Sequence, residues 1–295
     1  MKVFHHNDLD GYASGAVVAK YRNNYNEEDF FEVDYVMTLP LEKVAAKEEV
    51  WFVDYSFTEK TKHVLDTLLE KECNIIWIDH HTSSIDFLAK YPEYKKIAGY
   101  RQEGISGAAL TYMWCFDLFF EELPMAIKYV SDYDCWQFNY GEETEHFKYG
   151  MESVCQKPLS SIWTCLLNED EKENEKELNF ILNRGRLIYS FEENQNTYYR
   201  EKFWYETTLE GFEDESLNGI KAAVINKRSN SKIFGHLYDE YPLVIAWVFN
   251  GERYIYSFFA KKGGANCKKI AEELGGGGHT GAAGCSLDYL KFKKN

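Results

Sequence analysis

The chain has 295 residues, of which 45% are hydrophobic and 17% aromatic, so it can bury a large core, and its length favours about two domains. A formal net charge of -15 at pH 7 repels the phosphates of a long DNA duplex and excludes tight non-specific binding through a basic surface. No run of about 18 apolar residues and no leader-like start is present, and the 7 cysteines form no CxxC pair, which favours a cytoplasmic protein with reduced thiols and no membrane partner.

Three short apolar runs near the start of the chain are each followed by aspartate. They read "KVFHHNDLD", "VWFVDYS" and "NIIWIDHH", and stretches with a helical pattern such as 58–71 lie between them. This alternation predicts a parallel α/β sheet. Because the carboxyl ends of parallel strands line one crevice, six side chains are expected to converge there: Asp8, Asp10, Asp54, Asp79, His80 and His81.

Helices are expected to follow these strands. Gly11 permits a tight turn into a helix over 12–22, which begins with the small residues Ala13, Ser14 and Gly15 and can therefore pack closely. A further helix is predicted across "ISGAALTYMWCFDLFF", and another leads into "KYVSDYDCW".

The second half of the chain changes character twice. Residues 141–205 are highly charged and then place apolar residues at helical spacing, which indicates a solvated helical connector. Strands are expected at 220–226, 242–250 and 252–260, followed by a short helix "CKKIAEEL" and the run "GGGGHTGAAG". The predicted organisation is an N-terminal parallel-sheet domain over 1–140, the connector, and a smaller α/β domain over 206–295, with a cleft between the two domains.

The ligand types at the predicted strand ends point to hard divalent cations. Carboxylates and imidazoles without cysteine suit Mn²⁺, Mg²⁺ or Fe²⁺. Asp8 and Asp10 share a face and can each serve one of two ions, while Asp54 could bridge them. Two such ions leave room for a hydroxide and a phosphoryl oxygen in an in-line attack on phosphorus. The alternative, that these residues only cap helices or form turns, is less favoured because the pattern repeats at three strands.

Five motifs together resemble the DHH phosphoesterase superfamily. They are "HNDLDG" at 6–11, "VDYS" at 53–56, "DHH" at 79–81, "SDYDCW" at 131–136 and the terminal "GGGGHTGAAG". Their order resembles the order of motifs in the branch of this superfamily that has a DHH-associated C-terminal domain. That branch includes nano-RNases and phosphoadenosine phosphatases. The resemblance covers residues 1–140 and 206–295.

The resemblance implies a site with two divalent ions, Mn²⁺ first and Mg²⁺ as the alternative. The implied ligands are His6, Asp8, Asp10, Asp54, His80 and Asp132. His5 could replace His6, and Asp134 could replace Asp132, because the register of a single sequence leaves both open. Asp79 would orient a histidine, and His81 would face the phosphate.

The glycine run is interpreted as a phosphate-binding element of the smaller domain. Backbone N–H groups of Gly276, Gly277 and Gly278 are accessible without a Cβ, and His279 can donate to a phosphoryl oxygen. Lys261 and Lys262 stand where many nucleases of this family carry an Arg-Ser pair, and a lysine cannot copy the bidentate fork of arginine.

The resulting hypothesis is a metal-dependent hydrolase, an oligoribonuclease-like phosphoesterase. Its expected substrates are a short oligonucleotide, a dinucleotide or a nucleotide phosphate, and long duplex DNA is not expected to be cut. Two alternatives are a polyphosphate or pyrophosphate hydrolase and a non-catalytic nucleotide-sensing module. The oligomeric state stays open.

Overall fold

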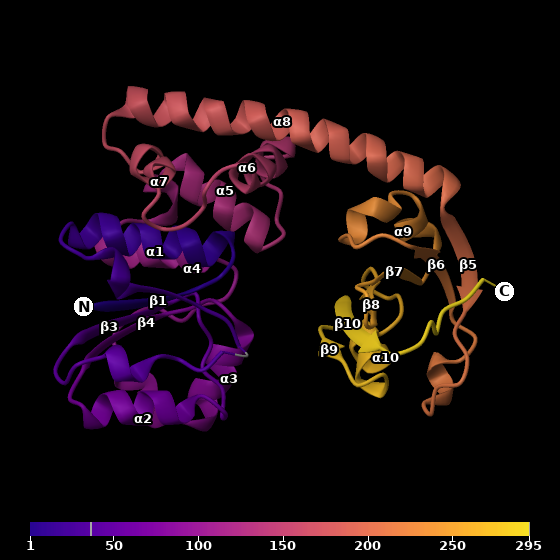
Figure 1. The fold of residues 1–295 in the computed structure, drawn as a ribbon, viewed down its shortest axis with the longest axis horizontal. Helices are drawn as coiled ribbons and strands as arrows, with labels where there is room; N and C mark the ends of the chain where they lie inside the picture. Colours follow the sequence, from indigo (N-terminus) through magenta and orange to yellow (C-terminus); the bar gives the residue numbers. More distant parts are fainter. Residues whose placement is uncertain (36, 295) are drawn as a thin grey trace. The chain divides into compact units, whose positions relative to one another are not determined.

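The computed structural model describes residues 1–35 and 37–294, and these form two compact units, Met1–Tyr189 and Ser190–Asn295. Each unit contains its own β-sheet, as Figure 1 shows. The sequence-based prediction of an α/β protein whose first sheet is parallel is confirmed. Within the described residues, no helix combines the length and the apolar character needed to cross a membrane.

The N-terminal sheet has four parallel strands in the order β2-β1-β3-β4. Their bounds are β1 Lys2–His6, β2 Phe30–Val33, β3 Glu49–Val53 and β4 Asn74–Ile78. β1, β3 and β4 are the three apolar runs of the sequence, whereas β2 was not predicted. It is a four-residue edge strand in which only Val33 is buried, so its hydrophobic pattern is weak.

Helices cover both faces of this sheet (Figure 1). Their bounds are α1 Leu9–Arg22 and α4 Gly107–Phe116 on one face, and α2 Lys62–Glu70 and α3 Thr82–Lys90 on the other. α1 begins before the predicted residue 12 because the Asp8 carboxylate accepts a hydrogen bond from the Gly11 N–H and caps the helix. α2 is shorter than the predicted 58–71, and α3 was not predicted.

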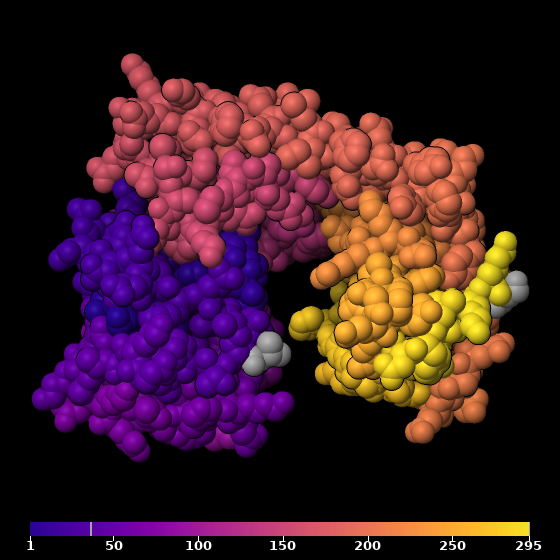
Figure 2. All heavy atoms as spheres, in the orientation of Figure 1, coloured from indigo at the N-terminus to yellow at the C-terminus, as the bar shows by residue number. Residues whose placement is uncertain are grey.

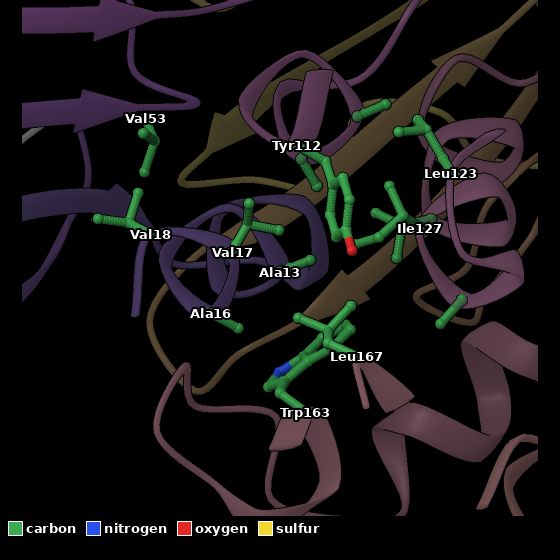
Figure 3. Packing of buried hydrophobic residues seen from close by; sticks show 14 of the residues in the cluster. Ala13, Ala16, Val17, Val18, Val53, Tyr112, Leu123, Ile127, Trp163 and Leu167 are labelled. Carbon is green, nitrogen blue, oxygen red and sulfur yellow. The ribbon is translucent and has the colours of Figure 1, made fainter. Parts of the chain in front are cut away.

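The segment predicted as a connector contributes to the core of the N-terminal unit. The helix expected to lead into "KYVSDYDCW" is α5 Met125–Asp134, which precedes this segment. The helices within the segment are α6 Glu142–Glu152, α7 Ser161–Leu166 and α8 Glu171–Lys202. Trp163 and Leu167 pack with Ala13, Ala16 and Val17 of α1 in one hydrophobic cluster (Figure 3). α7 packs against α1, and in the space-filling view the surface of this segment adjoins the indigo surface of the start of the chain (Figure 2). The boundaries at 140 and 205 stay predictions, whereas the compact units meet at Tyr189 and Ser190 within α8.

The C-terminal unit has a six-stranded mixed sheet in the order β5-β6-β7-β8-β10-β9. The strands are β5 Trp204–Thr208, β6 Lys221–Ile225, β7 Leu243–Phe249, β8 Tyr254–Phe259, β9 Gly277–Gly278 and β10 Ala282–Leu287. Two helices accompany them, α9 Leu237–Glu240 and α10 Cys267–Glu273. Strands and a helix were expected at the positions of β6, β7, β8 and α10. The glycine run forms β9, the turn after it and the start of β10.

Candidate metal centre

The carboxyl ends of β1, β3 and β4 bring acidic and imidazole side chains together around Asp54. The Asp54 Oδ1 lies 3.4 Å from His80 Nε2 and 3.9 Å from His81 Nδ1, and its Oδ2 lies 3.9 Å from His6 Nδ1. These histidines follow or end two separate strands, β1 and β4. The predicted convergence at one sheet edge is therefore present for these residues.

Asp54 is the most unusual residue of this cluster. Its side chain is 1% exposed, and among the described residues no N–H or O–H group donates a hydrogen bond to either carboxylate oxygen. Its φ of 56° is a left-handed conformation, which aspartate adopts more readily than most residues. Burial, together with the charges of Asp10 and Asp8, raises the pKa of this carboxyl well above its usual range. A buried carboxylate without donors is costly, and a bound cation would remove that cost.

One group of potential ligands consists of His6, Asp8 and Asp54. His6 Nδ1 lies 2.7 Å from Asp8 Oδ2, and this hydrogen bond raises the pKa of His6. His5 is not part of this group. Neighbouring residues of a strand point to opposite faces, and the buried His5 ring packs against Tyr12 and places its Nδ1 2.9 Å from the His6 carbonyl oxygen. The structure thus places His6, and not the alternative His5, in the cluster.

A second group forms around His80. Its Nε2 lies 3.6 Å from Asp10 Oδ2 and 3.2 Å from Asp134 Oδ2. The two Asp10 oxygens also accept hydrogen bonds from the N–H groups of Gly107 and Ala108, at 2.6 and 2.8 Å, so the first turn of α4 holds this carboxylate in place. Burial opposes the charge on His80, but a hydrogen bond with Cys135 and the nearby carboxylates outweigh it and raise the pKa of His80 to about 10.

The two aspartates of "SDYDCW" have different surroundings. Asp132 is buried, and its carboxylate accepts hydrogen bonds from the N–H groups of Asn139 and Tyr140 and from the Thr144 hydroxyl. Asp134 instead reaches His80, and burial together with the charge of Asp10 raises the pKa of Asp134 to about 7. The structure places the expected ligand Asp132 in hydrogen bonds of the turn after α5, and it brings the alternative, Asp134, next to His80. Which of the two aspartates binds a cation stays a prediction.

Asp79 and His81 form a pair at the edge of the cluster. The Asp79 Oδ1 lies 2.8 Å from His81 Nδ1, and its Oδ2 accepts hydrogen bonds from the hydroxyls of Ser56 and Ser84. Burial favours protonation of Asp79, but the hydrogen bond with His81 and the hydroxyl groups outweigh it and lower the pKa of Asp79. With both oxygens occupied, Asp79 fixes the orientation of the His81 ring.

The glycine run is an ordered hairpin. Gly277 and Gly278 pair with Gly284 and Ala283, and a Cβ at Gly276 would lie 2.1 Å from the Gly284 carbonyl oxygen. The N–H of Gly276 donates to Ala271, and the N–H of His279 donates to Ala282. Close packing thus explains part of the glycine content, and the N–H groups of Gly275, Gly276, His279 and Ala282 all donate within the C-terminal unit itself. Gly276 to His279 are exposed.

Sequence reasoning missed the residues that support the cluster. Ser56 and Ser84 hold Asp79, and Ser106 caps α4, whose first N–H groups bind Asp10. Hydroxyl residues directly after "VDY" and "DHH", and a serine before a helical run, are signals that could have identified them. Lys148 of α6 lay in the segment interpreted as a connector, so its position beside the cluster was also missed.

The fold of the chain is similar to that of known structures. The chain is similar to a pGpG-specific phosphodiesterase, PggH, from Vibrio cholerae, with 13% identity and a TM-score of 0.54 over 97% of this chain and 93% of that one. It is also similar to the DHH domain of PF0399, a member of a family of ribosomal proteins, with 15% identity and a TM-score of 0.54 over 98% of this chain and 82% of that one. No protein-family model matches the sequence, and no curated protein matches it.

Proposed function

We propose that this chain, which has the DHH-superfamily fold, is a divalent-metal-dependent phosphoesterase that hydrolyses short nucleotide-like substrates. The observation that carries the proposal is Asp54, whose buried carboxylate has no hydrogen-bond donor and faces three imidazoles within 3.9 Å. A protein retains such a group when a cation completes it.

The donor set fits two hard divalent cations. His6, Asp8 and Asp54 would hold one ion. His80 and Asp134, with Cys135 beside them and Asp10 3.6 Å from His80 Nε2, would hold the other, and Asp54 lies near both groups. Four carboxylates balance the charge of two divalent ions, and oxygen and nitrogen ligands suit Mn²⁺ or Mg²⁺. When bound, such ions supply a more acidic water and neutralise charge on a phosphoryl group.

The residues of the chain have separate tasks in this scheme. Asp79 holds Nδ1 of His81, which leaves the other ring nitrogen to donate to a phosphoryl oxygen. The His81 side chain is 37% exposed, so a substrate can reach it. The N-terminal turn of α4 holds the Asp10 carboxylate and limits how far it can move. These contacts set the geometry of the site before any substrate binds.

Substrate size is inferred from charge and from the relative. The chain carries a net charge of -15, which disfavours long polyanions, and the similar protein PggH is a pGpG-specific phosphodiesterase. We expect a dinucleotide or nucleotide phosphate as substrate, two Mn²⁺ ions, a cytoplasmic location, and binding of a phosphate by Gly276, Gly277, Gly278 and His279.

A substrate panel with metal analysis tests the proposal. The chain is loaded with Mn²⁺, its metal content is measured, and hydrolysis of di- to pentanucleotides, 3'-phosphoadenosine 5'-phosphate and polyphosphate is compared. We expect about two ions per chain and fastest hydrolysis of the shortest nucleotide esters. A chain that binds no Mn²⁺ and releases no product from any member of the panel would disprove the assignment.

A further inference from the structure

A cavity of about 380 Å³ lies beside the metal centre, entirely within the N-terminal unit. Asp8, Asp10 and Asp134 of the cluster form part of its lining. Six further residues of its lining carry the argument below: Asn7, Leu9, Val130, Tyr133, Lys148 and Gln156. A group bound in this cavity would therefore lie next to a phosphate held at the carboxylate cluster.

The size and the lining of the cavity suit a nucleoside. Pockets for small molecules start at about 300 Å³, so this one accepts a single nucleoside and not a run of nucleotides. Leu9, Val130 and the Tyr133 ring provide apolar contacts, while the side-chain amides of Asn7 and Gln156 can pair with the polar edge of a base. An inorganic phosphate chain would leave these apolar groups without a partner.

Lys148 is the one cation among the described residues that line the cavity. Its ammonium forms a 2.9 Å ion pair with Glu152 and lies 4.3 Å from the Tyr149 ring centroid and 5.4 Å from that of Tyr133. The Lys148 side chain is only 17% exposed. These contacts hold the ammonium beside the cavity, where it can donate to the acceptor atoms of a base.

We infer that this cavity binds the nucleoside attached to the scissile phosphate, with the Tyr133 ring and the Lys148 ammonium in contact with its base. The inference rests on the proposed function, because the phosphate must lie at the carboxylate cluster. It adds to that function the residues that recognise the nucleoside, through which the site would select nucleotide esters over inorganic polyphosphate. The two residues that would contact the base, Tyr133 and Lys148, lie on α5 and α6 of the N-terminal unit.

Comparing the affinities for mononucleotides and for inorganic phosphate separates the contribution of the nucleoside to binding from that of the phosphate. Calorimetric titrations of the Mn²⁺-loaded chain with AMP, GMP and inorganic phosphate are expected to show nucleotide binding at least tenfold tighter than phosphate binding. Lys148→Met and Tyr133→Leu are each expected to weaken nucleotide binding about tenfold and to change phosphate binding less than twofold. Thermal unfolding confirms that each variant is folded.

Lys62→Met is the matched control. Lys62 also pairs with an acid four residues later, Asp66, and lies over two tyrosine rings, but it is on α2 and lines no part of this cavity. Equal nucleotide affinity in Lys148→Met and Lys62→Met, or equal affinity for AMP, GMP and phosphate in the unmodified chain, would overturn the subsite. Tight nucleotide binding without hydrolysis of any ester would instead refute the proposed function alone.

Discussion

The acidic cluster of the N-terminal unit and the glycine hairpin of the C-terminal unit differ in how far their polar groups are satisfied. In the cluster, a buried carboxylate has no donor and its pKa is raised by burial and by neighbouring aspartates. In the hairpin, the exposed backbone already uses the N–H groups of Gly276 and His279 for hydrogen bonds to its own chain. Both regions were predicted from the sequence to take part in phosphate chemistry, and the first of them contains a buried carboxylate without a hydrogen-bond donor among the described residues.

This difference predicts unequal roles. A group that is stabilised only when a cation is present contributes to catalysis through that cation, so its loss should be severe. An ordered hairpin with an exposed histidine can add a contact to a substrate, but it does not depend on that contact for its fold. Substitutions in the two regions should therefore differ in size and in the quantity that they change.

Asp54→Asn is expected to have the largest effect. Asparagine keeps the size and tolerates the left-handed backbone at φ 56°, but it cannot balance two cations. We expect hydrolysis to fall about 10³-fold, equivalent to about 4 kcal/mol of transition-state stabilisation. At pH 8 and without metal, the free energy of unfolding of the variant should exceed that of the parent by about 1–3 kcal/mol, because a buried acid with a raised pKa has been removed. Denaturant titration of both metal-free proteins measures this difference.

Asp117→Asn is the control for this prediction. Asp117 ends α4 in the same left-handed conformation, at φ 53°, and it belongs to none of the ligand groups found among the described residues. This variant should keep the parental activity and metal content. Parental Mn²⁺-dependent hydrolysis in Asp54→Asn would show that the cluster is not the catalytic centre.

The paired variants Asp134→Asn and Asp132→Asn test which aspartate holds a cation. Asp134 faces His80 at 3.2 Å, so its loss should reduce bound metal and lower hydrolysis about 10²-fold. Asp132 accepts three hydrogen bonds in the turn after α5, so its loss should lower the free energy of unfolding by about 1–3 kcal/mol and leave the metal content unchanged. Metal analysis and denaturant titration of both variants measure these two quantities. Loss of bound metal in Asp132→Asn, with the metal content unchanged in Asp134→Asn, would identify Asp132 as the ligand.

The pH dependence of metal binding sharpens the same contrast. The pKa of Asp134 is raised to about 7 and that of His80 to about 10, so both groups bind protons that a cation must displace. The affinity for Mn²⁺ should therefore rise with pH. Below pH 7, where Asp134 also carries a proton, displacement of this second proton should add about another tenfold in affinity for each pH unit. Titrations between pH 6 and pH 8 measure this slope. Asp134→Asn should flatten it below pH 7, and an affinity that falls as the pH rises would contradict the cluster.

The convergence of polar side chains at one sheet edge could be predicted because short-range patterns determine it. His6 ends β1, Asp54 and His80 lie just after β3 and β4, and parallel strands bring their ends to one edge. The choice between Asp132 and Asp134 could not be predicted, because both lie in the same segment and the difference depends on where the turn after α5 places its N–H groups. The contact between Asp134 and His80 joins residues that are far apart in the sequence, so it leaves no signal in local spacing.

The packing of the segment 141–205, interpreted as a connector, also could not be predicted from local sequence patterns. Its charge predicted a solvated helix, yet Trp163 is buried against the small residues of α1, and Lys148 lies beside the metal centre. The apolar positions of α7 span only a few residues and are separated from α6 by a loop, so their helical pattern is too short to stand out from the charged surroundings. Tertiary packing, and not local pattern, recruits them to the core.

His279→Ala is expected to have the smallest effect of the series and to change a different quantity. The imidazole is exposed, and the hairpin hydrogen bonds at this residue use its backbone, so the fold should survive. If His279 donates to a substrate phosphate, its loss removes one hydrogen bond to a charged group, which corresponds to about a tenfold rise in KM. The metal content and kcat should stay near the parental values, since this side chain belongs to none of the ligand groups among the described residues. Steady-state kinetics with a dinucleotide and metal analysis of the same sample decide the matter. A loss of bound Mn²⁺ in His279→Ala would show that the hairpin serves the metal centre directly, and the division between a cluster that catalyses and a hairpin that binds would then be wrong.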